Sequence, residues 1–87
     1  MAHDIYLTKA ASRDLAGIPH NFLKKVDDAI LALADTPRPQ GTVKLKGADD
    51  LYRIRVGNYR ILYTVDDKAP SVTIVRVGDR REVYRQL

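Results

Sequence analysis

The second half of this 87-residue chain places arginines where their spacing could serve phosphate chemistry. Arg53 and Arg55 alternate with apolar residues, and Arg60 follows a short turn. A further group near the C-terminus consists of Arg80, Arg81 and Tyr84. The planar guanidinium fork of arginine can make paired hydrogen bonds to phosphate oxygens. Such a group could stabilise a phosphodiester whose negative charge grows in the transition state.

Other catalytic sets are poorly supported by the sequence. The chain has no cysteine, and His3 and His20 lie far from any other candidate ligand, so we expect no metal site. Ser12 and Ser71 have no nucleophile motif around them, and no glycine-rich phosphate loop is present, so we expect no cofactor. An RNA substrate would bring its own nucleophile, the 2′-hydroxyl, leaving the protein to position the strand, stabilise charge and move protons.

A second interpretation of the same residues stays open at this point. Arginines on an exposed sheet face could bind the carboxylates of a partner protein, and the tyrosines could belong to a half-buried core. Charge distribution favours an acidic partner in either case. Residues 1–41 contain five basic and five acidic groups, whereas residues 42–87 contain ten and six, so the net charge of +4 lies wholly in the second half.

Periodicity predicts a single α+β domain spanning residues 1–87. We expect a strand at residues 3–7, a helix at 9–16 capped by Thr8, and a helix at 20–35 that begins after Pro19. Residues 51–56, 59–65 and 71–77 then predict a three-stranded antiparallel meander, with a tight turn at Gly57-Asn58 and with Gly78 closing the last strand. We expect the apolar face of the sheet to pack on the helices.

Strand alternation assigns the candidate site to one face of this sheet. Tyr52, Ile54 and Val56 should point toward the core, which places Arg53 and Arg55 on the opposite face. If the three strands are neighbours, Arg60 and the C-terminal group can converge with them there. Lys44, Lys46, Arg76 and Arg81 are the additional cations that we expect to contact RNA.

Two motifs resemble the RelE/ParE toxin superfamily. The first extends from Lys44 through Leu51-Tyr52-Arg53-Ile54-Arg55-Val56-Gly57-Asn58-Tyr59-Arg60 to Tyr63. The second is the tail Val75-Arg76-Val77-Gly78-Asp79-Arg80-Arg81-Glu82-Val83-Tyr84, whose Arg-Glu-Val-Tyr ending resembles the RelE branch. The resemblance covers nearly the whole chain. It implies a RelE-like fold, cleavage of mRNA in the ribosomal A site, and neutralisation by a cognate antitoxin.

The resemblance also implies roles for individual residues. Arg60 matches the arginine that stabilises charge on the scissile phosphate, and Arg80 the one proposed to protonate the leaving 5′ oxygen. Tyr84 matches a tyrosine that stacks on or activates the nucleotide. Arg53 and Arg55 stand where some RelE proteins carry lysines. Because arginine stays charged, it is a poor general base. We hypothesise that Tyr84 serves as the base or helps one, with its phenolate favoured by nearby cations and with Arg53 and Arg55 as electrostatic support.

The expected partners are a RelB-like antitoxin, the ribosome and mRNA, and we expect the toxin and antitoxin to form a hetero-oligomer. Because only three residues follow Tyr84, we expect the antitoxin to cover the basic sheet face directly. The absence of cysteine, of a signal-peptide pattern and of a membrane-length apolar segment leads us to expect a cytoplasmic protein. The alternatives are a ParE-like inhibitor of DNA gyrase without nuclease activity, and an inactive homologue acting through protein binding.

Overall fold

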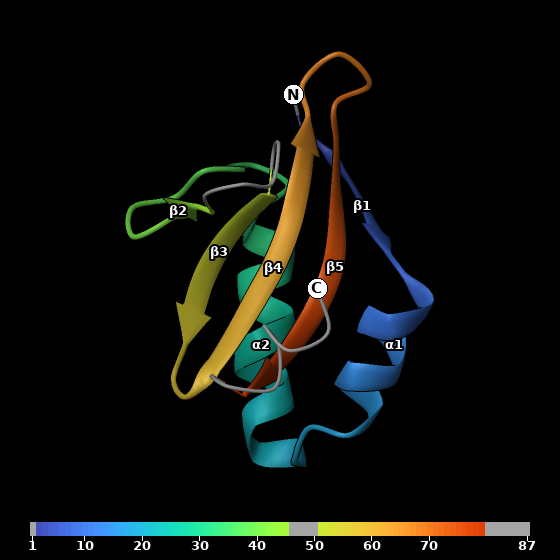
Figure 1. Cartoon of the computed structure of the whole chain (residues 1–87), viewed down its shortest axis with the longest axis vertical. Coiled ribbons are helices and arrows are strands. Elements are labelled where there is room, and N and C mark those ends of the chain that lie inside the picture. The colour runs from blue at the N-terminus through green and yellow to red at the C-terminus, as the bar shows by residue number, and fades with distance from the viewer. Residues whose placement is uncertain (1, 46–50, 80–87) are drawn as a thin grey trace.

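One mixed sheet carries two helices in the computed structural model, which describes residues 2–45 and 51–79 (Figure 1). The elements in chain order are β1 (Asp4–Leu7), α1 (Lys9–Ala16), α2 (His20–Ala32), β2 (Val43–Lys44), β3 (Leu51–Val56), β4 (Tyr59–Asp66) and β5 (Ser71–Asp79). The strand order is β1-β5-β4-β3-β2, with β1 parallel to β5 and the other neighbours antiparallel. The α+β class and the meander of β3, β4 and β5 are therefore confirmed.

The fifth strand is a difference from the sequence prediction. β2 has only two residues, Val43 and Lys44, which pair with Arg53 and Tyr52 of β3. Two residues are too few to show an alternating pattern, so the sequence gives no signal for this strand. It is defined by its antiparallel pairing with β3 and not by a pattern of its own.

Local signals explain how the helices begin and end. The Thr8 hydroxyl accepts a hydrogen bond from the Ala11 N–H at 3.0 Å, which confirms the predicted cap of α1. Pro19 precedes α2, whose first residue is His20. The helix ends at Ala32 rather than at the predicted Asp35 because the next N–H groups bond three residues back, a tightening that is common in a last turn.

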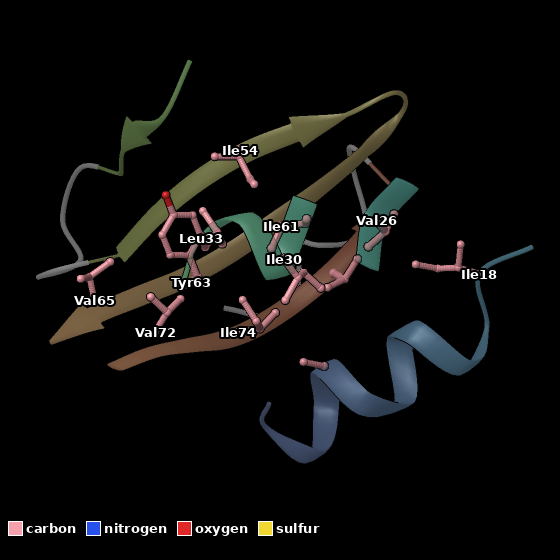
Figure 2. Close-up of a cluster of buried hydrophobic side chains, with 12 residues drawn as sticks. Ile18, Val26, Ile30, Leu33, Ile54, Ile61, Tyr63, Val65, Val72 and Ile74 are labelled. Carbon is pink, nitrogen blue, oxygen red and sulfur yellow. The ribbon is translucent and has the colours of Figure 1, made fainter. Parts of the chain in front are cut away.

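The central strand β4 shows how the sheet divides its side chains between two faces. Ile61, Tyr63 and Val65 point toward the helices and are buried there. Figure 2 shows Ile61 near Ile30 of α2 and Tyr63 near Leu33, and all of these side chains belong to the same cluster. Tyr52 and Val56 of β3 pack against the same core, as the alternation predicted.

A smaller apolar cluster lies on the opposite face of the sheet. It consists of buried Leu51 and Leu62, with Leu45 and Val75 packed against them. Val75 is the extra residue of a β-bulge, because Leu62 pairs with Arg76 while Tyr63 pairs with Ile74. The strand β5 also continues past the predicted stop at Gly78 to Asp79, which pairs with Tyr59.

No helix within the described ranges is long and apolar enough to cross a membrane.

Candidate functional site

Three arginines gather on the sheet face that points away from the helices, and we call this group the arginine face: Arg53, Arg55 and Arg60. Arg55 of β3 lies directly opposite Arg60 of β4, and Arg53 is opposite Leu62 one step further along. The tight turn Gly57-Asn58 joins Val56 to Tyr59, and Gly57 has a φ of 60°, which a glycine adopts without strain. The predicted convergence of Arg53, Arg55 and Arg60 is thus present in the fold.

The hairpin geometry brings the side chains of Arg55 and Arg60 close together. Val56 and Tyr59 flank the two-residue turn as a hydrogen-bonded pair, so the next pair, Arg55 and Arg60, is of the closer, non-hydrogen-bonded kind. Cβ atoms in such pairs are about 4.5–5.5 Å apart, and like charges placed this way repel each other. The two guanidinium groups therefore concentrate positive charge at this end of the hairpin, which suits an anion.

The environment of the arginine face strengthens its electrostatic effect. Arg53 and Arg60 are half-buried, with their Nε atoms shielded from solvent, while Arg55 is exposed. Buried Leu62 lies on the same face, opposite Arg53 and next to Arg60 along β4, and buried Leu51 lies next to Arg53 along β3. Charges beside apolar side chains interact more strongly with a ligand than charges surrounded by water.

A cleft of about 370 Å³ opens at the turn end of this hairpin. Arg55 and Arg60 line it together with Asn58, Tyr59 and Asp79. The cations can hold a phosphate, and the Asn58 amide can donate to or accept from a sugar hydroxyl. The Tyr59 ring packs on Phe22 of α2, with centroids 5.8 Å apart and planes at 57°. This contact ties one wall of the cleft to the core.

The other residues predicted to contact RNA do not belong to the arginine face as defined above. Lys44 is exposed on β2, opposite Tyr52. Arg76 is held by Asp14 of α1, with Nε 2.8 Å from Oδ2, and this carboxylate raises the pKa of the guanidinium. Four predicted site residues lie outside the described ranges: Lys46, Arg80, Arg81 and Tyr84. Their roles remain predictions.

Sequence reasoning missed several residues that line or position this region. The sequence predicts only a turn role for Asn58 and no role for Asp79, although Asp79 comes directly after the glycine that closes the predicted last strand. Asp14 was also missed, and its contact with Arg76 spans 62 positions, a separation at which no local pattern connects two residues. Within residues 2–45 and 51–79, no group of three or more His, Asp or Glu side chains is arranged to hold a metal ion.

Comparisons with known proteins agree with this architecture. Residues 5–84 match the family model described as the ParE toxin of the type II toxin–antitoxin system parDE. The toxin RelG of Mycobacterium tuberculosis is 32% identical over 99% of this chain and 100% of its own. A protein named RelE1 from Methanocaldococcus jannaschii is 34% identical over 94% of this chain and 93% of its own length.

Among the solved structures that share the fold at more than 25% sequence identity are two toxin–antitoxin complexes. The toxin–antitoxin complex RelBE2 of Mycobacterium tuberculosis contains a chain that is 29% identical, with a TM-score of 0.80 over 92% of this chain and 100% of that one. The archaeal RelE–RelB complex of Pyrococcus horikoshii contains one that is 26% identical, with a TM-score of 0.81 over 94% of this chain and 99% of that one.

Proposed function

Because this chain is a RelE-like member of the ParE toxin family of type II toxin–antitoxin systems, we propose that it is a ribosome-dependent endoribonuclease. It would cleave mRNA in the ribosomal A site and thereby stop translation in the cytoplasm. The observation that carries the proposal is the arginine face, where Arg55 and Arg60 oppose each other beside a cleft and Arg53 stands next to them. This concentration of fixed positive charge suits a scissile phosphodiester.

The proposed reaction uses the substrate's own hydroxyl. The 2′-oxygen forms a bond to phosphorus while the bond to the 5′-oxygen breaks, which leaves a 2′,3′-cyclic phosphate and a 5′-hydroxyl. Arg60, with Arg53 and Arg55, stabilises the negative charge that develops on the phosphoryl oxygens. Tyr84 takes the 2′-hydroxyl proton as a phenolate, and Arg80 gives a proton to the leaving oxygen, as the family resemblance implies. Guanidinium groups supply the positive charge, so this mechanism requires no metal ion.

The ribosome has a specific part in this proposal. The arginine face and its cleft of about 370 Å³ can bind a phosphate, but a phosphate site alone does not fix the conformation of a flexible strand. In-line attack needs the 2′-oxygen held close to phosphorus, and an mRNA strand constrained in the A site would meet that need. Free RNA should therefore be cut poorly.

The arginine face also suits an antitoxin partner. The mycobacterial and archaeal relatives of known structure were solved as toxin–antitoxin complexes. We propose that a RelB-like antitoxin neutralises this chain by placing carboxylates over the arginine face in a hetero-oligomer, so that antitoxin and mRNA compete for the same cations.

The test is primer-extension mapping of mRNA ends after purified toxin is added to programmed ribosomes. We expect cuts in the A site that persist in EDTA, are much weaker on free mRNA, and fall about 100–1,000-fold in Arg60→Ala, the range typical for removing one transition-state donor. Arg13→Ala is the matched control, because Arg13 is an exposed arginine on α1.

The main alternative is a ParE-like inhibitor of DNA gyrase without nuclease activity, because the matched family model is described as the ParE toxin. A folded protein that inhibits growth but produces no cuts on ribosomes would refute the nuclease proposal. The gyrase-inhibitor alternative would then be tested by DNA supercoiling, and the inactive-homologue alternative requires that neither assay responds.

A further inference from the structure

A second cleft lies along the outer edge of β3, around the corner from the arginine face. Its volume is about 460 Å³, within the range of about 300–1,000 Å³ typical of small-molecule sites. One wall is the loop Pro39-Gln40-Gly41, and Ala29 of α2 contributes to the lining. The other wall is β3 itself, from Arg53 to Val56. The proposed reaction uses the guanidinium groups of Arg53 and Arg55, but it assigns no role to Gln40 or to the backbone of β3 at this edge.

The edge of β3 is open at Arg55. The Leu45 N–H donates to the Leu51 carbonyl at 2.9 Å, which shows that the backbone of Leu51 faces β2. Alternation along the strand then turns the backbone groups of Arg53 and Arg55 to the same edge. Arg53 pairs with Val43, but β2 has no residue opposite Arg55. Among the described residues, the N–H and C=O of Arg55 have no backbone partner on that edge.

An open N–H beside an open C=O suits the edge of a nucleobase. The two groups of one extended residue point the same way, so they can form paired hydrogen bonds with a neighbouring donor and acceptor on a base. Gln40, which lines the opposite wall, adds an amide that can both donate and accept. The cleft therefore offers hydrogen-bond groups from two sides.

The loop that presents Gln40 is held firmly by the sheet. The Tyr63 hydroxyl donates to the Pro37 carbonyl at 2.7 Å, and the Thr42 N–H donates to the Pro39 carbonyl at 3.0 Å. Arg38 bonds Asp67 at 3.0 Å in the turn between β4 and β5. Gly41 has a φ of 93°, a conformation that lets the chain turn back toward β2. A loop fixed in this way loses little entropy when a ligand binds.

Charge and length favour a nucleotide over a protein strand as the occupant. Among the described residues, Arg53 and Arg55 line the cleft and no carboxylate does. The open edge amounts to Arg55 alone, because β2 already pairs with Arg53 and the hairpin turn starts at Gly57. One open residue can bond a base, but an added strand needs several consecutive residues.

We propose that this cleft is a nucleobase subsite, in which Gln40 and the backbone of Arg55 bind the edge of one base of the RNA. Arg55 also lines the cleft at the hairpin turn, so the two sites adjoin. A phosphate bound in the cleft at the hairpin turn would place the base of a neighbouring nucleotide within reach of Gln40. The subsite rests on the proposed nuclease function, and it gives that activity a sequence preference, since phosphate contacts position a strand while base contacts distinguish sequences.

The first test compares where variants cut, rather than how fast. Wild type, Gln40→Ala and Gln40→Glu are added to ribosomes programmed with a mixed mRNA pool, and cut positions are sorted by the bases around each cut. Gln40→Glu keeps the size of the side chain but loses its donors, so we expect the ratio of cutting at preferred and disfavoured bases to change about tenfold. Asn21→Asp, an exposed amide-to-acid change at the start of α2, should leave the ratio unchanged. An unaltered ratio in both Gln40 variants, including a uniform loss of cutting, overturns the subsite.

The second test measures binding without catalysis. The isotope-labelled chain is titrated with each of the four ribonucleoside 5′-monophosphates while amide resonances are followed by NMR. We expect saturable, base-dependent shifts at the Gln40 side chain and at the backbone amides of Gly41 and Arg55, with Lys68 at the far end of the sheet unmoved. If wild type cuts no mRNA, the proposed function fails and this titration alone decides the subsite. The subsite is overturned if none of the nucleotides produces these shifts. This holds also if a parallel titration with an antitoxin peptide does produce them.

Discussion

Removing the carboxylate of Asp14 should destabilise the fold, because this side chain joins α1 to β5 through a largely buried ion pair. Its Oδ2 accepts from Arg76 Nε at 2.8 Å and from the Val77 N–H at 3.0 Å, and its Oδ1 accepts from the second guanidinium nitrogen at 3.1 Å. β1 pairs with β5 only as far as Ile74, so Asp14 binds the strand edge where β1 no longer does. It also ties α1 to the segment that leads into the predicted catalytic Arg80.

The size of the effect follows from burial. The side chains of Asp14 and Arg76 are 17% and 16% exposed, so this pair lies closer to a buried pair than to a surface one. Surface pairs contribute about 0–1 kcal/mol, whereas breaking a buried pair costs about 3–5 kcal/mol. We expect Asp14→Ala to lower the free energy of unfolding by about 2–3 kcal/mol, and Tm by roughly 10–20 °C. A domain of this length has about 4–13 kcal/mol in total, so the variant should still fold.

The assay is urea unfolding followed by circular dichroism. Asp28→Ala, an exposed carboxylate on α2, is the control and should change stability by less than about 0.5 kcal/mol. Asp14→Asn keeps one acceptor for the Val77 N–H and should fall between Asp14→Ala and wild type. A double-mutant cycle with Arg76→Ala isolates the pair itself. A loss below about 0.5 kcal/mol in Asp14→Ala would refute the reasoning from burial.

Three further predictions concern the site and its surroundings. Tyr84→Phe should lower cleavage about 100-fold or more on programmed ribosomes if the phenol is the base, and full activity would dispose of that role. Arg55→Gln removes the like charge opposite Arg60, so it should raise the free energy of unfolding by about 0.2–1 kcal/mol while weakening cleavage; a less stable variant would contradict the repulsion argument. The hydrogen bond from Arg38 holds the pKa of Asp67 below its usual 3.8, so the stability from this bond is complete above that pH and is lost as pH falls through the lowered pKa. Asp67→Asn should therefore show a smaller drop in Tm than wild type between about pH 6 and pH 2, and an equal drop would contradict the assignment.

Local chemistry in the sequence determined most of the elements and one face of the site. The hydroxyl of Thr8 and the apolar spacing of the second helix depend only on near neighbours, and both are as predicted apart from the earlier helix end. Alternation between Arg53, Ile54 and Arg55, followed by a two-residue turn, was sufficient to place Arg53 and Arg55 opposite the core. Period-two alternation has this power because a strand has only two faces.

The tertiary structure determined the features that depend on residues far apart in the sequence. The parallel pairing of β1 with β5, the bulge at Val75 and the two-residue strand β2 result from how the whole sheet packs on its helices. The same is true of the carboxylate of Asp14 on the edge of β5, and of Gln40 beside the open backbone of Arg55. Register and strand order depend on packing summed over distant residues, whereas caps, turns and alternation are determined within a few positions of the chain.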